Sequence, residues 1–328
     1  CCTHTRGKDL CMPDTGSVMK KHSPPFFDLI GDVHGQHGKL VALLHRLGYQ
    51  PSELGFRHPE GRKVVFLGDY IDRGPNIREV LQTVRAMVES GDAHAIMGNH
   101  EFNAVLFAEP DGRGGFLKQH GDRMLTTHCA SLAQLSDRQP EWKSWLEWMK
   151  HLPLFLDLGD LRAVHACWDV QSITRLQGKS LADLDFLHAC ARKGSPEHHA
   201  VENVLKGPEM AMPAGYVFHD KEGIARKSVR VRWWNLPERA QVSHLSMPEP
   251  FDVPGDACPD EIRHLPCYAP DEPPVFFGHY WLPPERRREP LAPNLACLDY
   301  SAAFAANPLT AYRWEGEREL RSHHFVTA

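Results

Sequence analysis

The chain has 328 residues, of which 42% are hydrophobic and 24% charged, and its formal net charge is −5 at pH 7. These values are typical of a globular protein that is long enough to bury a core. The negative charge disfavours nucleic acid and anionic membranes as partners, and no apolar run of about 18 residues predicts a transmembrane helix. Histidine, the commonest metal ligand, occurs 21 times.

The start of the chain indicates how the chain is divided into regions, and the cysteines indicate its cellular compartment. Residues 1–22 are polar and lack the apolar segment of a signal peptide, so we expect a disordered extension there. Residues 23–328 are expected to form a single domain. The nine cysteines are scattered without paired spacing, which is typical of reduced thiols and favours a cytoplasmic location.

Three short apolar segments each run into a glycine-containing loop with polar side chains. The segments are Phe26–Ile30, Val64–Leu67 and His94–Met97, and the loops read GDVHG (31–35), GDYIDRG (68–74) and GNHE (98–101). Between them, Lys39–Leu47 and Asn76–Glu89 have apolar residues at helical spacing. This alternation predicts parallel strands joined by helices, an arrangement in which ligands bind at the carboxyl ends of the strands.

The loop after the second segment carries the most informative chemistry. It presents Asp69, Asp72 and Arg73 directly after a predicted buried strand. Two carboxylates beside an arginine indicate bound cations and an anionic substrate, for which phosphate is the obvious candidate.

Two later histidines also follow predicted strands. His165 comes after Leu161–Val164, and His279 comes after Val275–Phe277 and Gly278. Each is a candidate metal ligand, and a hydrogen-bonded core histidine is the alternative. Cys167 is a further candidate ligand, but a small buried thiol is the expected role.

These blocks resemble the signature blocks of the calcineurin-like metallophosphoesterases of the phosphoprotein phosphatase type. That family includes Ser/Thr protein phosphatases, bacterial diadenosine tetraphosphatases and bacterial RNA-end phosphatase domains. The resemblance extends from Phe26 to about Trp314. It implies an α/β fold in which two mixed β-sheets pack as a sandwich flanked by helices, with a dinuclear metal site at the carboxyl ends of the strands.

The resemblance also implies the members of the site. The implied metal ligands are Asp32 and His34 for one ion, Asn99, His165 and His279 for the other, and Asp69 as the bridge between them. A donor set of carboxylate, amide and imidazole groups suits two divalent ions, for which we expect Mn²⁺, with Fe or Zn²⁺ as alternatives. In such sites a metal-bridging hydroxide attacks the phosphorus in line with the leaving group.

The same resemblance implies roles for the remaining polar residues of these blocks. Arg73, together with Asn99, would bind the substrate phosphate, and Arg73 would stabilise its developing charge. His100 would protonate the leaving oxygen, and Asp72 would orient His100 through a hydrogen bond.

The segment from about residue 168 to residue 274 is expected to be a variable cap that sets substrate choice. Helices are predicted at Leu181–Arg192 and Glu197–Lys206, an irregular or strand-like piece at 228–234, and no regular structure in the proline-dense stretch 248–274. Arg232 is assigned to substrate binding, with Arg230 as the alternative candidate. The other interpretation is that the arginine points to the solvent and does not bind substrate.

The end of the chain is predicted to return to strands. Leu295–Asp299, Thr310–Trp314 and His323–Val326 are expected to belong to a second sheet. A stripe of apolar residues with helical spacing from Trp142 to Met149 predicts a helix that faces the core rather than a base-stacking platform.

Three functions are compatible with these features. The first is hydrolysis of phosphomonoesters, as by a Ser/Thr protein phosphatase; the alternative is hydrolysis of dinucleoside polyphosphates or RNA-end phosphates. A catalytically silent binding protein on the same scaffold is the third. The blocks GHYW (278–281) and ACLD (296–299) look like the diadenosine tetraphosphatase branch, whereas Glu101 stands where that branch has Asp. A phosphorylated protein, nucleotide or small molecule is therefore the expected partner.

Overall fold

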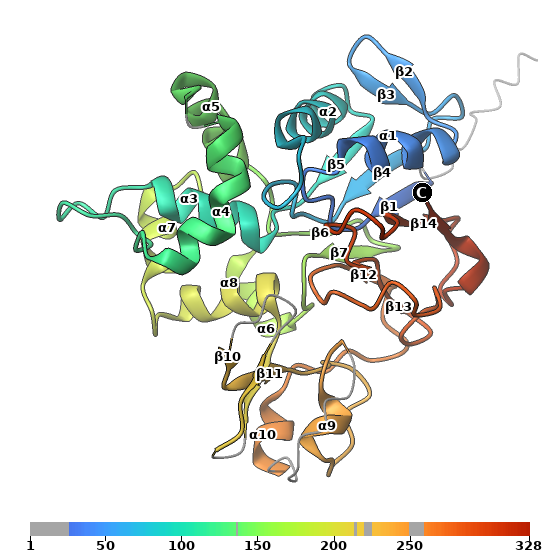
Figure 1. The fold of residues 1–328 in the computed structure, drawn as a ribbon. Helices are drawn as coiled ribbons and strands as arrows, with labels where there is room; N and C mark the ends of the chain where they lie inside the picture. The colour runs from blue at the N-terminus through green and yellow to red at the C-terminus, as the bar shows by residue number, and fades with distance from the viewer. Residues whose placement is uncertain (1–25, 136, 213–214, 220–224, 249–258) are drawn as a thin grey trace, which may run out of the picture.

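The structure, a computed structural model, describes residues 26–135, 137–212, 215–219, 225–248 and 259–328, so the predicted extension at 1–22 lies outside it. Two β-sheets form its centre (Figure 1). The first has the order β15 (Phe325–Thr327), β14 (Thr310–Trp314), β1 (Phe27–Ile30), β4 (Lys63–Phe66) and β5 (Ala93–Ala95). The second has the order β13 (Leu295–Cys297), β12 (Val275–Phe277), β7 (Arg162–Val164) and β6 (Phe155–Asp157).

Helices and small hairpins surround the two sheets. The α-helices are α1 (His37–Arg46), α2 (Ile77–Glu89), α3 (Asn99–Ala108), α4 (Asp122–Leu135), α5 (Gln139–Lys150), α6 (Val170–Leu176), α7 (Leu184–Ala191), α8 (Pro196–Lys206), α9 (Val242–Leu245) and α10 (Pro259–His264). The short strand pairs are β2 (Gln50–Ser52) with β3 (Gly55–Arg57), β8 (Glu209–Ala211) with β11 (Ser228–Arg230), and β9 (Phe218–His219) with β10 (Ala225–Arg226). No helix of the described part is both long and apolar enough to cross a membrane.

Side chains from the two sheets share one apolar cluster, which makes the sheets a sandwich. Leu29 and Val65 of the first sheet are buried in the same cluster as Ala163 and Phe276 of the second. Because side chains alternate along a strand, the neighbours of these residues point to the outer faces, where helices cover them. The mixed α/β architecture predicted from the motifs is therefore confirmed.

The predicted alternation of strands and helices at the start of the chain is also confirmed. β1, β4 and β5 are parallel neighbours. α1 and α2 lie where the apolar spacing predicts them, and α5 buries Trp142, Trp145 and Met149 against the core. The carboxyl ends of the three strands consequently meet at one edge of the first sheet.

The sheet assignment of the last strands is partly wrong. β13 belongs to the second sheet as predicted, but β14 pairs antiparallel with β1, and β15 pairs with β14 in the first sheet. A 3₁₀ turn (Ser322–His324) precedes β15 where a continuous strand was expected. A strand's apolar pattern indicates burial but not the sheet that supplies the burial.

The expected cap consists of two parts. α6, α7 and α8 pack together against the rest of the domain, whereas β8, β11, α9 and α10 form a lobe that extends away from the sheets in Figure 1. This lobe has its own apolar cluster, which includes Met210, Val229 and Ile262.

The prediction that the proline-dense stretch has no regular structure is wrong, because α10 forms within it. α10 begins at Pro259, and proline is tolerated at the first position of a helix since that residue has no intrahelical amide bond to lose.

Candidate metal centre and active site

The predicted site residues come together at the edge where the strands of both sheets end. The loops after β1, β4 and β5 supply one group, and the ends of β7 and β12, which are parallel neighbours, supply His165 and His279. The structure brings together and buries Asp32, His34, Asp69, Asp72, Asn99, His100, His165 and His279.

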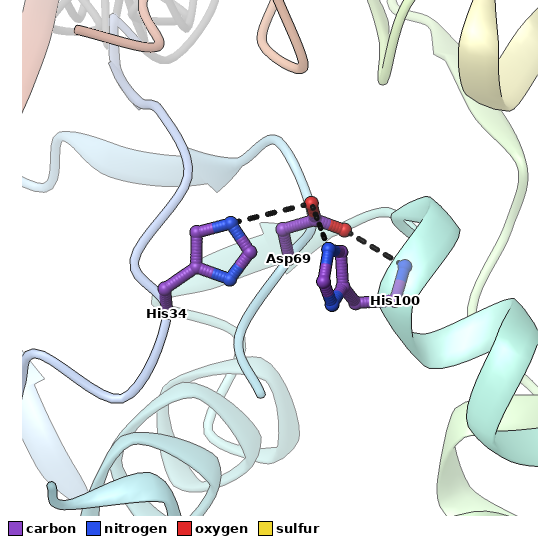
Figure 2. A group of neighbouring side chains, drawn as sticks. All are labelled: His34, Asp69 and His100. Atoms are coloured by element: carbon purple, nitrogen blue, oxygen red, sulfur yellow. Dashed lines mark hydrogen bonds and ion pairs between the residues drawn. The ribbon is translucent and has the colours of Figure 1, made fainter. Parts of the chain in front are cut away.

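Asp69 lies at the centre of this cluster with its two oxygens facing different donors. Oδ2 is 3.5 Å from Nε2 of His34, and Oδ1 is 3.5 Å from Nε2 of His165. Two groups of converging ligand atoms share Asp69, one with His34 and His100 and the other with Asp32 and His165. Figure 2 shows the first group. This is the geometry that a carboxylate bridging two cations requires.

The second group of donors converges on the side-chain oxygen of Asn99. This oxygen lies 3.0 Å from Nε2 of His165 and 2.7 Å from Nδ1 of His279. The three side chains come from the start of α3 and from the loops after β7 and β12, which are distant in sequence. Their meeting places the amide and the two imidazoles in one small volume, as the predicted second ligand set requires.

Backbone carbonyls orient the imidazoles. Nδ1 of His34 donates to the carbonyl oxygen of Ile71 at 2.9 Å, and Nδ1 of His165 donates to that of Leu67 at 2.7 Å. Metal-binding histidines typically donate their second ring nitrogen in this way, which directs the other nitrogen at the ion. Both rings are thus held with Nε2 facing Asp69.

The cluster fits divalent cations on electrostatic grounds. Nε2 of His34 and Nε2 of His279 are buried and have no hydrogen-bond partner among the described residues. Burial raises the pKa of Asp32 well above its usual value, and the nearby Asp299 carboxylate raises it further. Burial lowers the pKa of His34 to about 3, which keeps this imidazole neutral and able to bind a metal. A cation among these groups would offset the repulsion between the carboxylates.

Two glycines allow the carboxylates to lie against the backbone. A Cβ atom on Gly98 would overlap Oδ1 of Asp69, and a Cβ atom on Gly278 would overlap Oδ1 of Asp32. In the space that Gly278 leaves open, the backbone amide of His279 donates to Oδ2 of Asp32 at 3.1 Å. These positions therefore require glycine because of close approach.

His100 is held by Asp72, as predicted. Nδ1 of His100 lies 2.5 Å from Oδ2 of Asp72. Burial lowers the pKa of His100, but the Asp69 and Asp72 carboxylates outweigh burial and raise it above its usual value. A protonated imidazole can donate a proton but cannot bind a metal, so this environment favours the general-acid assignment over the ligand assignment.

Asp72 has two further partners that the sequence did not reveal. Nδ1 of His128 lies 2.8 Å from Oδ2 of Asp72, and the hydroxyl of Ser131 donates to Oδ1 and accepts from the backbone amide of Asp72 at 3.0 Å. Both residues lie on α4, one helical turn apart by sequence. The sequence offers only a histidine and a serine at helical spacing, in a segment for which no helix was predicted.

Glu101 fixes the backbone of the loop that carries Asp69. Its carboxylate accepts hydrogen bonds from the amides of Gly98, Asp69, Tyr70 and Ile71 at 2.8–3.2 Å. Burial, with the charge of Asp69, raises the pKa of Glu101 to about 7. Asp69, Asp72 and Arg73 all have positive φ angles in this loop, and Glu101 is one group that holds this uncommon conformation.

A cavity of about 1160 Å³ adjoins the cluster and is lined by Arg73, Asn99, His100 and His279. The guanidinium carbon of Arg73 lies 3.9 Å from the ring centroid of Trp281, which was not predicted as a site residue. Among the described residues that line the cavity, lysine and arginine side chains outnumber the acidic ones, Glu202 and Glu209. The cavity is therefore suited to a large anionic ligand.

The structure places Arg230, and not Arg232, at this cavity. Arg230 lines it and donates to the carbonyl oxygen of His279 at 3.1 Å. Arg232 is absent from the lining described, so the structure favours Arg230, the alternative candidate, at this position. β11 ends at Arg230, and Arg232 lies beyond the end of this strand.

Asp299 and Cys167 complete the surroundings. Asp299 is buried and accepts hydrogen bonds from the amides of Trp281 at 2.7 Å and Ser301 at 2.9 Å. It was present in the ACLD block but was not assigned a role. Cys167 is a buried thiol in the apolar core, as expected.

Comparison with known proteins establishes the family. Residues 27–201 match the family described as "Calcineurin-like phosphoesterase". The chain belongs to this family. All predicted metal ligands except His279 lie within the matched range, and the expectation that the chain is a member of a phosphoester hydrolase family is confirmed.

Curated relatives carry names of dinucleoside polyphosphate hydrolases. The chain is 45% identical over 113 residues to the asymmetrical bis(5'-nucleosyl)-tetraphosphatase PrpE of Halalkalibacterium halodurans, a match that covers 34% of this chain and 44% of the relative. It is 31% identical over 154 residues to a symmetrical bis(5'-nucleosyl)-tetraphosphatase of a Marinomonas species, covering 45% of this chain and 48% of the relative. The matches thus span about half the length of these relatives.

Among solved structures, a cold-active protein-tyrosine phosphatase of a psychrophilic Shewanella species aligns over 90% of this chain and 80% of its own. The identity is 17% and the TM-score 0.42, so this likeness carries no argument about function.

Proposed function

We propose that the chain is a metal-dependent phosphoester hydrolase that acts on dinucleoside polyphosphates. The observation that carries the hydrolase assignment is the position of Asp69 between two groups of donor atoms beside a large cationic cavity. The names of the curated relatives favour dinucleoside polyphosphates over phosphoproteins, the class that the sequence motifs put first.

The proposed metal ligands are those that the resemblance implies. Asp32 and His34 would hold one divalent ion, Asn99, His165 and His279 would hold the other, and Asp69 would contribute to both, with Mn²⁺ as the proposed metal. Divalent cations of this kind lower the pKa of bound water and would stabilise the negative charge on the phosphoryl oxygens in the transition state.

The protein's own groups perform the remaining steps. Arg73, supported by the ring of Trp281, binds phosphate oxygens and stabilises the charge that develops on them. His100 donates the proton on Nε2 to the leaving oxygen while Asp72 holds its Nδ1–H. A phosphoanhydride leaving group is weakly basic, so this proton matters less for a dinucleoside polyphosphate than for an alkyl phosphate.

The deciding experiment is a side-by-side assay of the purified chain with Mn²⁺. The substrates are diadenosine tetraphosphate, a phosphoserine peptide, a 3′-phosphorylated RNA and p-nitrophenyl phosphate, and the nucleotide products are separated by anion exchange. We expect the highest kcat/KM on diadenosine tetraphosphate. A preference for the phosphopeptide or the RNA would reject the substrate assignment, and no turnover of any substrate with the metals bound would reject the hydrolase assignment.

A further inference from the structure

One face of α4 carries three polar side chains that bind the segment between β4 and α2. His128, Ser131 and Gln134 follow one another at three-residue spacing, so they lie on one side of the helix. The side-chain amide of Gln134 donates to the carbonyl oxygen of Gly74 at 3.0 Å and accepts from the backbone amide of Ile77 at 2.9 Å. This face of α4 therefore holds the segment at the end where α2 begins.

The same face holds Asp72 through both its backbone and its side chain. The hydroxyl of Ser131 accepts from the backbone amide of Asp72 at 3.0 Å and donates to Oδ1 of its carboxylate. Nδ1 of His128 lies 2.8 Å from Oδ2, the oxygen that also faces His100. Rotation of the Asp72 carboxylate would break one of these bonds, so they fix its plane before any substrate binds.

The conformation and charge of Asp72 require such support. Its φ angle is 67°, in the left-handed region that residues other than glycine rarely adopt. Burial raises the pKa of Asp72, but hydrogen bonds from His100 and His128 outweigh burial and hold this pKa below its usual value. A buried ionised carboxylate needs hydrogen-bond donors around it, and α4 supplies two of them.

His128 is also in contact with α3, the helix that carries His100. The rings of His128 and Phe107 meet edge to face, with centroids 5.7 Å apart. Nε2 of His128 is buried and has no hydrogen-bond partner in the part of the chain that the structure describes. A buried nitrogen without a partner costs stability, and an apolar side chain at this position would avoid that cost. The cost indicates that the bond from Nδ1 to Asp72 is retained for function.

We propose that His128 and Ser131 are positioning residues, which hold the Asp72 carboxylate in the orientation that aligns His100 for proton donation. The inference rests on the proposed function, in which His100 is the proton donor, and adds two residues that are absent from the described cavity lining. Loss of either contact lets the carboxylate rotate and misaligns His100, while the groups that bind substrate stay in place. The loss therefore falls on kcat and not on KM.

The first test compares two aryl phosphates as substrates of the full chain in the same Mn²⁺ buffer. Phenyl phosphate has a more basic leaving group than p-nitrophenyl phosphate, so its hydrolysis depends more on proton donation. Ser131→Ala and His128→Phe should each lower kcat about tenfold on phenyl phosphate and less than about threefold on p-nitrophenyl phosphate, with KM changed less than about twofold. His128→Asn, whose side-chain amide keeps a donor near the position of Nδ1, should retain most of the rate.

Thr126→Val is the matched control, because it also removes a hydroxyl from α4. Thr126 is exposed, and its hydroxyl donates to the carbonyl oxygen of Asp122 in the same helix. Both rates should be unchanged in this variant, and thermal unfolding confirms that each variant is folded. Equal losses on the two substrates in Ser131→Ala and His128→Phe, or losses no larger than in Thr126→Val, would overturn the proposal.

The second test needs no turnover. The proton between Nδ1 of His100 and Asp72 lies in a short hydrogen bond to a carboxylate, and such protons give far-downfield proton NMR signals. The signal is recorded with Zn²⁺, which is diamagnetic, and is assigned by its absence in His100→Asn. It should move upfield in Ser131→Ala and His128→Phe but not in Thr126→Val.

An unchanged signal in Ser131→Ala and His128→Phe, or no such signal in the original chain, would overturn the positioning role. Absence of turnover together with the expected shift would reject the hydrolase assignment alone. The failure of the inference is thus distinguishable from the failure of the proposed function.

Discussion

At the scale of single residues, Asp69 and His100 lie side by side but have different surroundings. Both oxygens of Asp69 face imidazole nitrogens of the proposed ligand sets, whereas Nδ1 of His100 is bound to Asp72. The proposed roles, metal bridge and proton donor, predict different consequences for mutations at neighbouring positions.

Asp69→Asn should abolish stable binding of the metal pair, because a neutral amide cannot offset the repulsion between two cations. His100→Asn should keep the metals and lose rate on poor leaving groups, by about 100-fold or more for a phosphoserine peptide. Metal content by mass spectrometry and kcat on the peptide and on diadenosine tetraphosphate measure both effects.

The contrast between the variants provides the control. The rate loss of His100→Asn should be smaller on diadenosine tetraphosphate, whose leaving group is less basic. Equal loss of metal in the two variants would contradict the division of roles, and an equal rate loss on both substrates would contradict proton donation by His100.

At the scale of elements, a buried cluster of charged and polar side chains joins β1 to β14. Asp28 on β1 is fully buried and accepts hydrogen bonds from Arg62 at 3.0 Å, Arg313 on β14 at 3.0 Å and the hydroxyl of Tyr49 at 3.1 Å. Burial and Asp28 raise the pKa of Tyr49, so its hydroxyl remains a donor at physiological pH. This cluster connects β1 with β14, its antiparallel neighbour from near the end of the chain.

Arg62→Met should destabilise the fold by about 3 kcal/mol, because it leaves the buried Asp28 charge with fewer partners. Urea unfolding followed by circular dichroism measures the loss. Arg85→Met is the control, since Arg85 pairs with Glu89 on the surface of α2 and should cost less than about 1 kcal/mol. Similar losses in the two variants would show that the Asp28 cluster contributes no more than a surface pair.

The glycines and Glu101 show how elements position the site. Gly98 and Gly278 allow carboxylates to lie against the backbone, and Glu101 binds the amides of the loop after β4. Positions 98 and 278 are therefore glycine because a carboxylate lies against the backbone there. Position 101 is a glutamate because its carboxylate reaches the backbone amides of the neighbouring loop.

At the scale of the whole molecule, the proposed metals link the two sheets. Asp32 and Asp69 follow strands of the first sheet, and His165 and His279 follow strands of the second. Ions held by all four would act as a crosslink between the sheets in the folded state.

Removal of divalent metal with a chelator should lower the thermal unfolding temperature, and Mn²⁺ should restore it. At a free concentration about 100 times the dissociation constant, binding to the folded state alone contributes about 2.7 kcal/mol. Differential scanning calorimetry measures the shift, and Asp69→Asn is the control that should show little response. An equal response of both proteins to Mn²⁺ would contradict binding at this cluster.

Much of the fold and site was predictable because the relevant information is local. Each of GDVHG, GDYIDRG and GNHE follows an apolar strand directly, and parallel strands necessarily bring their carboxyl ends to one edge. His165 and His279 were predictable for the same reason, since each also follows a strand. The family and its chemistry therefore followed from the order of residues alone.

The remaining features depend on contacts between segments that are far apart in the chain. Neither the pairing of β14 with β1 nor the contacts of His128 and Ser131 with Asp72 has a local pattern in the sequence. Apolar spacing predicts that a strand or helix is buried, but it does not specify which residues it meets. By itself the sequence determined the family and the types of residue that gather around Asp69, whereas only the tertiary structure decided which side chains support these residues and which line the cavity beside them.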